Sequence, residues 1–193
     1  EWVNNYDKEQ GFTGIECNTR AVCKDSEGKL WFGTVKGVIE YDPKEDYANF
    51  VEPITNITGI KLFLEDQDLL RYSQGSYFWY KLPKELSLPH DKNHLTFNFI
   101  GIDLKTPEKT QYKFMLDGFD DDWSPPLIKN EATYSNIPPG EYVFKVKSVN
   151  NDGLWNEEAT EFAFEVGLPF WRKWWFYLVV VGGLGLGVYA VIQ

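Results

Sequence analysis

Basic residues are scarce in this sequence of 193 residues, which has 19 Lys and Arg against 29 Asp and Glu and a formal net charge of −10 at pH 7. A protein that binds nucleic acid needs a basic surface to neutralise the phosphate groups. The charge balance therefore argues against nucleic acid as a partner.

Cysteine and histidine are almost absent, which limits metal chemistry. The sequence has only Cys17, Cys23, His90 and His94, and these residues lack the short paired spacing of a zinc site. The two cysteines could form a disulfide in an oxidising compartment, or they could stay free as a buried pair within a strand. The sequence leaves both alternatives open.

A catalytic constellation is also lacking, because no serine forms a recognisable nucleophile motif with a histidine. The aromatic run at residues 78–80 could stack on sugar rings, but in a sequence with 17% aromatic residues such a run more often belongs to a core. We therefore expect no enzyme, no cofactor and no metal site. One acidic cluster lacks the Asp-x-Asp-x-Asp-Gly order of a calcium loop and is typical of a turn: Asp117, Asp120, Asp121 and Asp122.

The printed residues show no targeting segment at their N-terminal end, and they begin in mid-pattern at Glu1. It stops at Gln193, directly after an apolar run. We therefore expect it to be an excerpt of a longer protein, in which other segments carry the ligand site or the output.

An uncharged apolar run closes the sequence, from Trp174 to Ile192. As a helix it would be about 28 Å long, close to the ~30 Å hydrocarbon core of a bilayer. Trp171, Trp174 and Trp175 stand at its start, as aromatic belts do at membrane interfaces. Residues 169–193 are therefore predicted to be a juxtamembrane segment and one transmembrane helix, and a buried core element is the alternative.

Two features of this run concern packing and orientation. Gly183 and Gly187 have the small-x-x-x-small spacing that lets two helices approach closely, although glycine is common in membrane helices in general. Arg172 and Lys173 lie on the N-terminal side, whereas cytoplasmic flanks usually carry the excess of Lys and Arg. Charge alone thus leaves the orientation open.

Residues 93–168 have the alternation of an antiparallel β-sandwich. Their short segments are bounded by Gly and Pro turns and predict an immunoglobulin-like or fibronectin-like fold. Residues 51–92, with strand candidates at 57–64 and 78–82, are expected to connect the sandwich to what precedes it. The residues that alternate with polar ones are Leu95, Phe97 and Phe99, then Tyr142, Phe144 and Val146, then Phe162, Phe164 and Val166.

A small meander is predicted before residue 50, where three strand candidates between residues 21 and 41 alternate with glycine turns. The run D-S-E-G-K-L-W-F-G-T-V-K-G, which contains Trp31, Gly33 and Gly37, resembles the repeat of two-component regulator propellers. The resemblance implies that residues 1–50 are the last, incomplete blade of a β-propeller. An ordinary hairpin with an aromatic core is the alternative.

Four motifs follow in order: Y-K-F-M-L-D-G-F-D-D-D-W, T-Y-S-N-I-P-P-G-E-Y, N-N-D-G-L-W and P-F-W-R-K-W-W-F. Together they resemble the three-Y domain of two-component regulators over residues 95–176, with Ile137 where leucine is usual. Tyr142, at a strand start after a Pro-Gly turn, also matches a tyrosine corner. The resemblance implies structural roles for Tyr112, Gly118, Trp123, Tyr134, Gly140, Tyr142, Gly153 and Trp155.

These resemblances imply the juxtamembrane end of a hybrid two-component sensor histidine kinase. The expected function is an extracytoplasmic sensor and relay module that passes a ligand-induced rearrangement of a homodimer to the transmembrane helix. Membrane lipid and a carbohydrate, bound through the missing propeller blades, are the other implied partners. Residues 1–170 would be periplasmic, the anchor would be single-pass in the inner membrane, and a kinase would follow Gln193.

A membrane-tethered adhesion or carbohydrate-binding sandwich without a kinase is the alternative function. The residues after Gln193 would separate the two hypotheses. A charged helix that leads into a kinase or regulator favours the relay, and a short tail favours the tethered sandwich.

Overall fold

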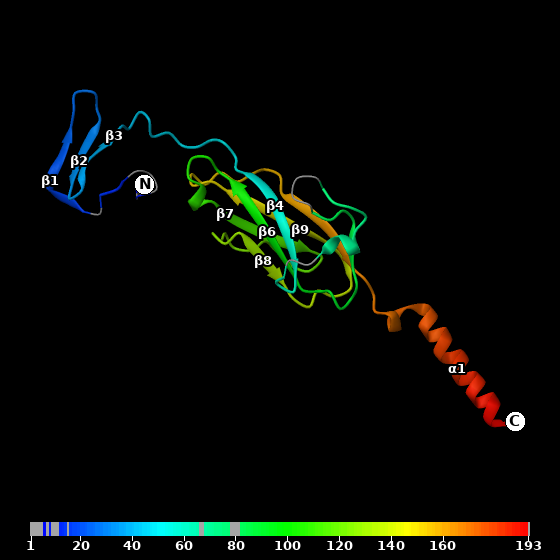
Figure 1. Ribbon diagram of the computed structural model, residues 1–193. Coiled ribbons are helices and arrows are strands. Elements are labelled where there is room, and N and C mark those ends of the chain that lie inside the picture. The colour runs from blue at the N-terminus through cyan, green and yellow to red at the C-terminus, as the bar shows by residue number, and fades with distance from the viewer. Residues whose placement is uncertain are drawn as a thin grey trace.

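Three parts follow one another along the chain in Figure 1: a small sheet, a β-sandwich and a helix. The figure shows a computed structural model, which describes residues 6, 8, 12–14, 16–65, 68–77 and 82–192. The small sheet and the helix extend from opposite ends of the sandwich.

The small sheet is an antiparallel meander of β1 (Cys17–Lys24), β2 (Leu30–Thr34) and β3 (Gly37–Tyr41). Asp25 holds its first turn, because one carboxylate oxygen accepts the backbone N–H groups of Glu27 and Lys29. Trp31 Nε1 donates to the other oxygen at 2.9 Å, and this bond lowers the pKa of the Asp25 carboxyl. The predicted meander is confirmed, whereas its place in a propeller stays a prediction.

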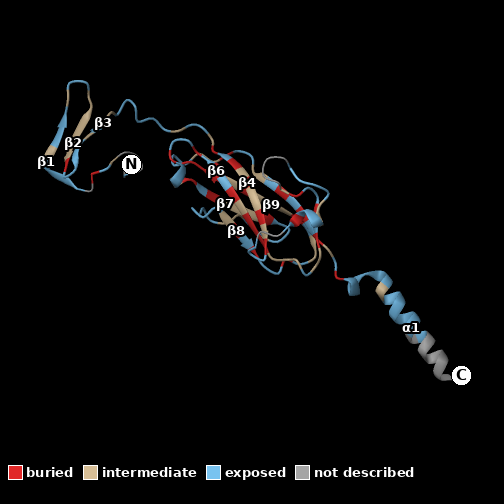
Figure 2. Ribbon diagram, viewed as in Figure 1, coloured by how far each residue is buried: buried red, intermediate tan, exposed pale blue. Residues whose placement is uncertain are grey.

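The faces of the small sheet are largely exposed (Figure 2), with Val22 at 57% and Val38 at 68%. Cys17 and Cys23 are both free and both exposed. Of the two alternatives that the sequence leaves open, the structure has the free cysteines and not the disulfide, but it places them at the surface and not in a buried pair. The physical reason is that both lie on the edge strand β1, and within the described residues no second layer covers it.

Two sheets face each other in the sandwich. One has the order β5 (Leu86–Leu88), β10 (Thr160–Val166), β9 (Gly140–Val149) and β7 (Gln111–Asp117). The other has the order β4 (Ile54–Leu62), β6 (Leu95–Ile102) and β8 (Glu131–Tyr134). Of these pairings β5 with β10 is parallel and the others are antiparallel. Short 3-10 helices are η2 (Leu69–Tyr72), η3 (Pro107–Lys109) and η4 (Phe170–Arg172).

Aromatic rings fill the space between the two sheets. Phe97 of β6 stacks on Phe144 of β9, with ring centroids 4.1 Å apart, and both side chains are fully buried. The alternation in the sequence predicts these positions, because successive side chains of a strand point to opposite faces. Each such side chain contributes about 1.5–3 kcal/mol when it is fully buried. Other members of this core include Leu62, Leu86, Leu88, Leu95, Phe99, Leu116, Ile137 and Val146.

The stretch expected to be a connection, 51–92, also supplies strands to the sandwich. β4 pairs with β6 from Ile54 opposite Ile102 to Leu62 opposite Leu95. β5 pairs with the last part of β10. The sandwich therefore begins at Ile54, upstream of the expected boundary. Most of the strand candidate at 78–82 lies outside the described residues.

The apolar run at the end of the chain forms the helix α1 (Trp174–Ile192). Its large side chains are exposed at the N-terminal end, with Trp174 at 75% and Val181 at 67%. Among the described residues, no helix reaches the length and apolar character that crossing a membrane demands. The transmembrane assignment therefore stays a prediction.

Candidate functional site

Tyr112 ties the two sheets of the sandwich together. Its ring is buried and meets Phe99 with centroids 5.2 Å apart, and its hydroxyl accepts the backbone N–H of Gly101 at 3.0 Å. Tyr112 belongs to β7 and Gly101 to β6, so this bond joins opposite sheets. Only glycine fits at 101 without a shift, because a Cβ there would lie 2.8 Å from Ser148 Cβ.

Tyr134 ties β8 to the turn that follows β7. Its hydroxyl donates to Asp120 Oδ2 at 2.7 Å, and the same oxygen accepts the backbone N–H of Leu116 at 2.8 Å. Burial and then the Asp120 carboxylate raise the pKa of Tyr134, so the phenol stays protonated at neutral pH.

Three members of the acidic cluster at the end of β7 are engaged in the local fold. Asp120 binds Tyr134, Asp122 accepts the backbone N–H of Trp123 at 2.7 Å, and Asp117 pairs with Lys145 at 2.9 Å. The Lys145 ammonium lowers the pKa of Asp117. In the part of the chain that the structure describes, no group of three or more metal-ligating side chains is assembled.

Tyr142 forms a corner at the start of β9. Its hydroxyl donates to the Pro138 carbonyl at 2.8 Å, while its ring stacks on Phe164 of β10 with centroids 5.6 Å apart. Burial raises the pKa of this phenol as well. Gly140 leaves room for the hydroxyl, because a Cβ at 140 would lie 3.2 Å from its oxygen. This is the geometry of a tyrosine corner.

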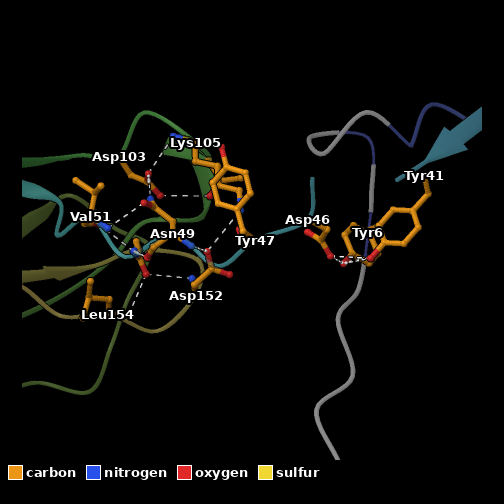
Figure 3. Close-up of polar contacts among 12 residues, drawn as sticks. Tyr6, Tyr41, Asp46, Tyr47, Asn49, Val51, Asp103, Lys105, Asp152 and Leu154 are labelled. Carbon is orange, nitrogen blue, oxygen red and sulfur yellow. Dashed lines mark hydrogen bonds and ion pairs between the residues drawn. The ribbon is translucent and has the colours of Figure 1, made fainter. Parts of the chain in front are cut away.

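A cluster of polar side chains holds residues 47–51 against one end of the sandwich (Figure 3). We call it the linker clamp, and it consists of Asn49 with Asp103, Lys105, Asn150 and Asp152. The Asn49 N–H donates to Asp152 Oδ2 at 2.6 Å, and Asn49 Nδ2 donates to Asp103 Oδ1 at 3.0 Å. Lys105 Nζ donates to the Tyr47 carbonyl at 2.6 Å, with the ammonium 5.5 Å from the Tyr47 ring centroid.

Asn150 is the centre of the linker clamp. Its Oδ1 accepts the backbone N–H groups of Asp152 at 3.1 Å and Leu154 at 2.9 Å, which shapes the turn after β9. Its Nδ2 donates to the carbonyls of Asn49 at 2.8 Å and Val51 at 3.1 Å. The side chain is 3% exposed. One buried amide therefore holds the turn and the linker at the same time.

At the other end, a folded connection leads from the sandwich to α1. The Gly167 N–H donates to the Leu88 carbonyl at 2.7 Å, which prolongs the pairing of β10 with β5. The rings of His90 and Trp171 meet edge-on, with centroids 5.0 Å apart and planes at 85°. Backbone hydrogen bonds close η4, with the Arg172 N–H donating to the Pro169 carbonyl at 2.9 Å. The exit is thus a series of defined contacts.

The remaining predicted motif residues have local roles in turns and close packing. A Cβ at Gly33 would lie 2.8 Å from that of Ala21. Lys113 lies near the Trp123 and Trp155 rings, at 5.3 and 4.5 Å from their centroids. Positive φ, which glycine adopts without strain, occurs at Gly37, Gly118 and Gly153.

The predicted helix-packing residues have no contact that tests them. A Cβ at Gly183 would meet nothing within 4 Å beyond its own helix, and the surroundings of Gly187 lie outside the description. The aromatic run at 78–80 is outside the described residues too. The packing role of the two glycines stays a prediction.

Sequence reasoning missed most of the linker clamp. The Asn150 turn belongs to a motif that the sequence shows, but Asn49 and Asp103 stand in no motif. Their contact joins positions 54 residues apart, so no local pattern reports it. The available signal was the side-chain chemistry of Asn and Asp, which commonly cap turns.

Comparison with known proteins places the tyrosines in a family. Residues 103–167 match the Y_Y_Y domain family, and this stretch contains Tyr112, Tyr134 and Tyr142. The resemblance to the three-Y domain is therefore confirmed there. The matched stretch carries β7, β8, β9 and β10 of the sandwich.

Relatives of greater length also match. Histidine kinase P4 of Formosa agariphila is 24% identical over 197 residues, which is 99% of this chain and 14% of the relative. The extracellular domain of a hybrid two component system from B. thetaiotaomicron has 24% identity and a TM-score of 0.59, over 76% of this chain and 20% of that chain. That structure supports the all-β fold.

A further solved structure is less similar. It is the extracellular domain of a one component system from B. thetaiotaomicron, with 20% identity and a TM-score of 0.49, over 78% of this chain and 20% of that chain. This chain thus spans a small part of each relative's length.

Proposed function

We propose, from the premise that residues 103–167 form a Y_Y_Y domain, that this chain is the extracytoplasmic relay segment of a membrane-bound two-component receptor. The observation that carries the proposal is the sandwich itself, which has a fixed connection at each end. The linker clamp holds residues 47–51, and the contacts of Gly167 and Trp171 hold the exit to α1. A displacement of the linker can therefore reach the helix through a packed core. The match to a histidine kinase supports this assignment.

The small sheet is, in this proposal, the last blade of a propeller that receives the ligand. Two observations support it: the exposed faces of the sheet, and the Trp31 and Gly33 motif on β2. A single sheet must bury its hydrophobic face against another layer, so neighbouring blades would supply the missing cover. A carbohydrate is the proposed ligand class, on the resemblance to two-component regulator propellers, and its binding site would lie in those blades.

The proposed anchor is α1, in the inner membrane, with residues 1–170 in the periplasm. The exposed apolar side chains of α1 support this, because a helix that is apolar on all sides is stable in lipid or in a core. Signalling would require a homodimer with two arrangements, of which the ligand binds one more tightly. Gly183 and Gly187 would lie where the two helices approach.

The proposal predicts self-association of the chain in detergent micelles, measured by analytical ultracentrifugation. The substitutions Gly183→Ile and Gly187→Ile together should weaken association at least about tenfold, or about 1.4 kcal/mol. Gly185→Ile is the matched control, because at 100° per residue position 185 faces away from 183 and 187. It should leave the association constant nearly unchanged.

A chain that stays monomeric at every accessible concentration would contradict the relay. It would favour the competing function, a tethered adhesion or carbohydrate-binding sandwich, which needs no second copy. Equal weakening by all three substitutions would contradict the assigned helix face.

A further inference from the structure

Residues 170–175 form an exposed segment of aromatic and cationic side chains between the sandwich and the helix, which we call the collar. Trp171 is 45% exposed, Trp174 75% and Trp175 44%. Arg172 and Lys173 stand between these rings in the sequence, and both are exposed. The collar comprises η4, Lys173 and the first two residues of α1. It therefore lies where the folded part of the chain meets the apolar helix.

The charge of the collar is opposite to that of the chain. The protein carries a formal net charge of −10, yet residues 167–192 contain two basic residues and no acidic one. Across the residues that the structure describes, neither Arg172 nor Lys173 has an ion-pair partner. Both cations are therefore available to an anionic group outside the chain.

Contacts with the sandwich and hydrogen bonds within η4 hold the collar in place. The edge-on contact between His90 and Trp171 fixes one ring, and the backbone bonds of η4 fix the turn that carries Arg172. Lys173 follows η4 as its C-cap, and its carbonyl accepts the Phe176 N–H at 3.0 Å in the first turn of α1. The two cations are thus part of a folded turn rather than of a free tail.

One kind of partner suits both the aromatic and the cationic side chains of the collar. Indole rings prefer the boundary between hydrocarbon and water, where an apolar body and an N–H are both accommodated. A guanidinium can bind a phosphate with two parallel hydrogen bonds, and an ammonium binds it as a point charge. A bilayer with anionic headgroups offers both: phosphates for the two cations, and beside them the boundary with the hydrocarbon for the indole rings.

We propose that the collar binds anionic lipid headgroups, with Arg172 and Lys173 on the phosphates and the tryptophans beside them at the interface. This inference rests on the proposed membrane anchor and adds to it a lipid preference. It also accounts for cations on the flank where the general orientation rule does not place them: their role there is contact with headgroups.

The test uses the whole chain reconstituted in phosphatidylcholine vesicles that contain trace spin-labelled phosphatidylglycerol or phosphatidylcholine. Electron paramagnetic resonance measures the fraction of each label that is immobilised by the protein. The wild type should associate with phosphatidylglycerol at least about threefold more strongly than with phosphatidylcholine. Salt at about 1 M, where the Debye length is about 3 Å, should remove most of that preference.

Matched variants separate the collar from general charge. Arg172→Gln with Lys173→Gln should bring the preference close to one, whereas Lys36→Gln with Lys44→Gln removes the same charge from the small sheet and should keep the wild-type value. Equal association of the wild type with both lipids, or an unchanged preference in the collar variant, overturns the inference.

Resistance to carbonate extraction reports insertion independently of lipid preference. If the chain inserts but shows no preference for phosphatidylglycerol, only the role assigned to the collar is contradicted. A chain that is extracted completely fails to anchor, and that result overturns both the proposed membrane attachment and the lipid contact built on it.

Discussion

At the scale of single residues, each of the three tyrosines contributes both a buried ring and a hydrogen-bonded hydroxyl. Each buries its ring in the same core, and each hydroxyl satisfies a different group: the Gly101 N–H for Tyr112, the Asp120 carboxylate for Tyr134, and the Pro138 carbonyl for Tyr142. A buried phenol needs such a partner, because an unpaired polar group in a core costs free energy. Phenylalanine would fill the same volume but remove the hydrogen bond to each partner.

Tyr142→Phe should lower the free energy of unfolding by about 1–2 kcal/mol, because it keeps the ring and removes the donor to the Pro138 carbonyl. Urea denaturation should show a lower midpoint with an unchanged slope. Tyr47→Phe is the matched control, since Tyr47 is 70% exposed and its change should stay within about 0.5 kcal/mol. Wild-type stability of Tyr142→Phe would contradict the corner's contribution.

Alkaline pH should destabilise the sandwich through Tyr134. Burial and Asp120 raise the pKa of the folded phenol above the value of about 10 in an unfolded chain. Its contribution is therefore complete below about pH 10 and is lost as pH rises beyond that, because the unfolded state then releases the proton first. Each group of this kind adds up to about 1.4 kcal/mol of lost stability per pH unit.

Urea denaturation at a series of pH values between about 9 and 12 measures this slope. Tyr134→Phe removes the titrating group, so its stability should fall less steeply with pH than that of the wild type, although its stability at pH 7 is lower. Parallel curves for the two proteins would show that Tyr134 does not titrate differently in the folded and unfolded states.

At the scale of elements, the sequence was most informative about local pattern. The alternation of apolar side chains predicted β6, β9 and β10 because each strand buries every second residue. It did not reveal that β4 and β5 complete the two sheets, because pairing partners 30 residues or more apart are set by register and not by local composition. The exposure of the two cysteines was missed for a related reason, because a strand-like pattern does not show whether another layer covers the strand.

The linker clamp was hidden for the same physical reason. Asn150 lies in a recognisable turn motif, but its amide also serves carbonyls at Asn49 and Val51, about a hundred positions away. A side chain that joins two distant backbone segments has no periodic or motif signal at its second site. Only the fold brings Asn49 next to Asp103 and Asp152.

Asn150→Ala should release both the turn and the linker. We expect a loss of about 2–3 kcal/mol, because the linker carbonyls lose their donor and the turn amides their acceptor in a largely buried site. Hydrogen exchange followed by NMR should show faster exchange at the Asn49 and Leu154 amides. Asn151→Ala, at an exposed neighbouring position, is the control. Unchanged protection at Asn49 in Asn150→Ala would contradict the central role of this side chain.

At the scale of the whole molecule, burial is concentrated in one of the three parts. Figure 2 shows buried residues gathered in the sandwich, whereas the small sheet and the described part of α1 are mostly exposed. Val38 on β3 and Leu178 on α1 are 68% and 62% exposed, respectively, although both are apolar. The sandwich can therefore sustain its own fold, while the parts on either side gain from further layers. In the proposed function these layers are propeller blades and lipid.

The hairpin of β9 and β10 has a mechanical consequence. Its closed tip carries Asn150 and Asp152, and its open end leaves at Gly167, with unbroken register from Thr160 opposite Val146 to Val166 opposite Gly140. β10 has 7 residues, so at about 3.3 Å per residue it is a covalent strut of roughly 23 Å. In the proposed function, a strand this stiff would pass a displacement from one end to the other without enlarging it. Any amplification of the signal would then depend on the angle between the β10 strands of two copies, and not on deformation within either strand.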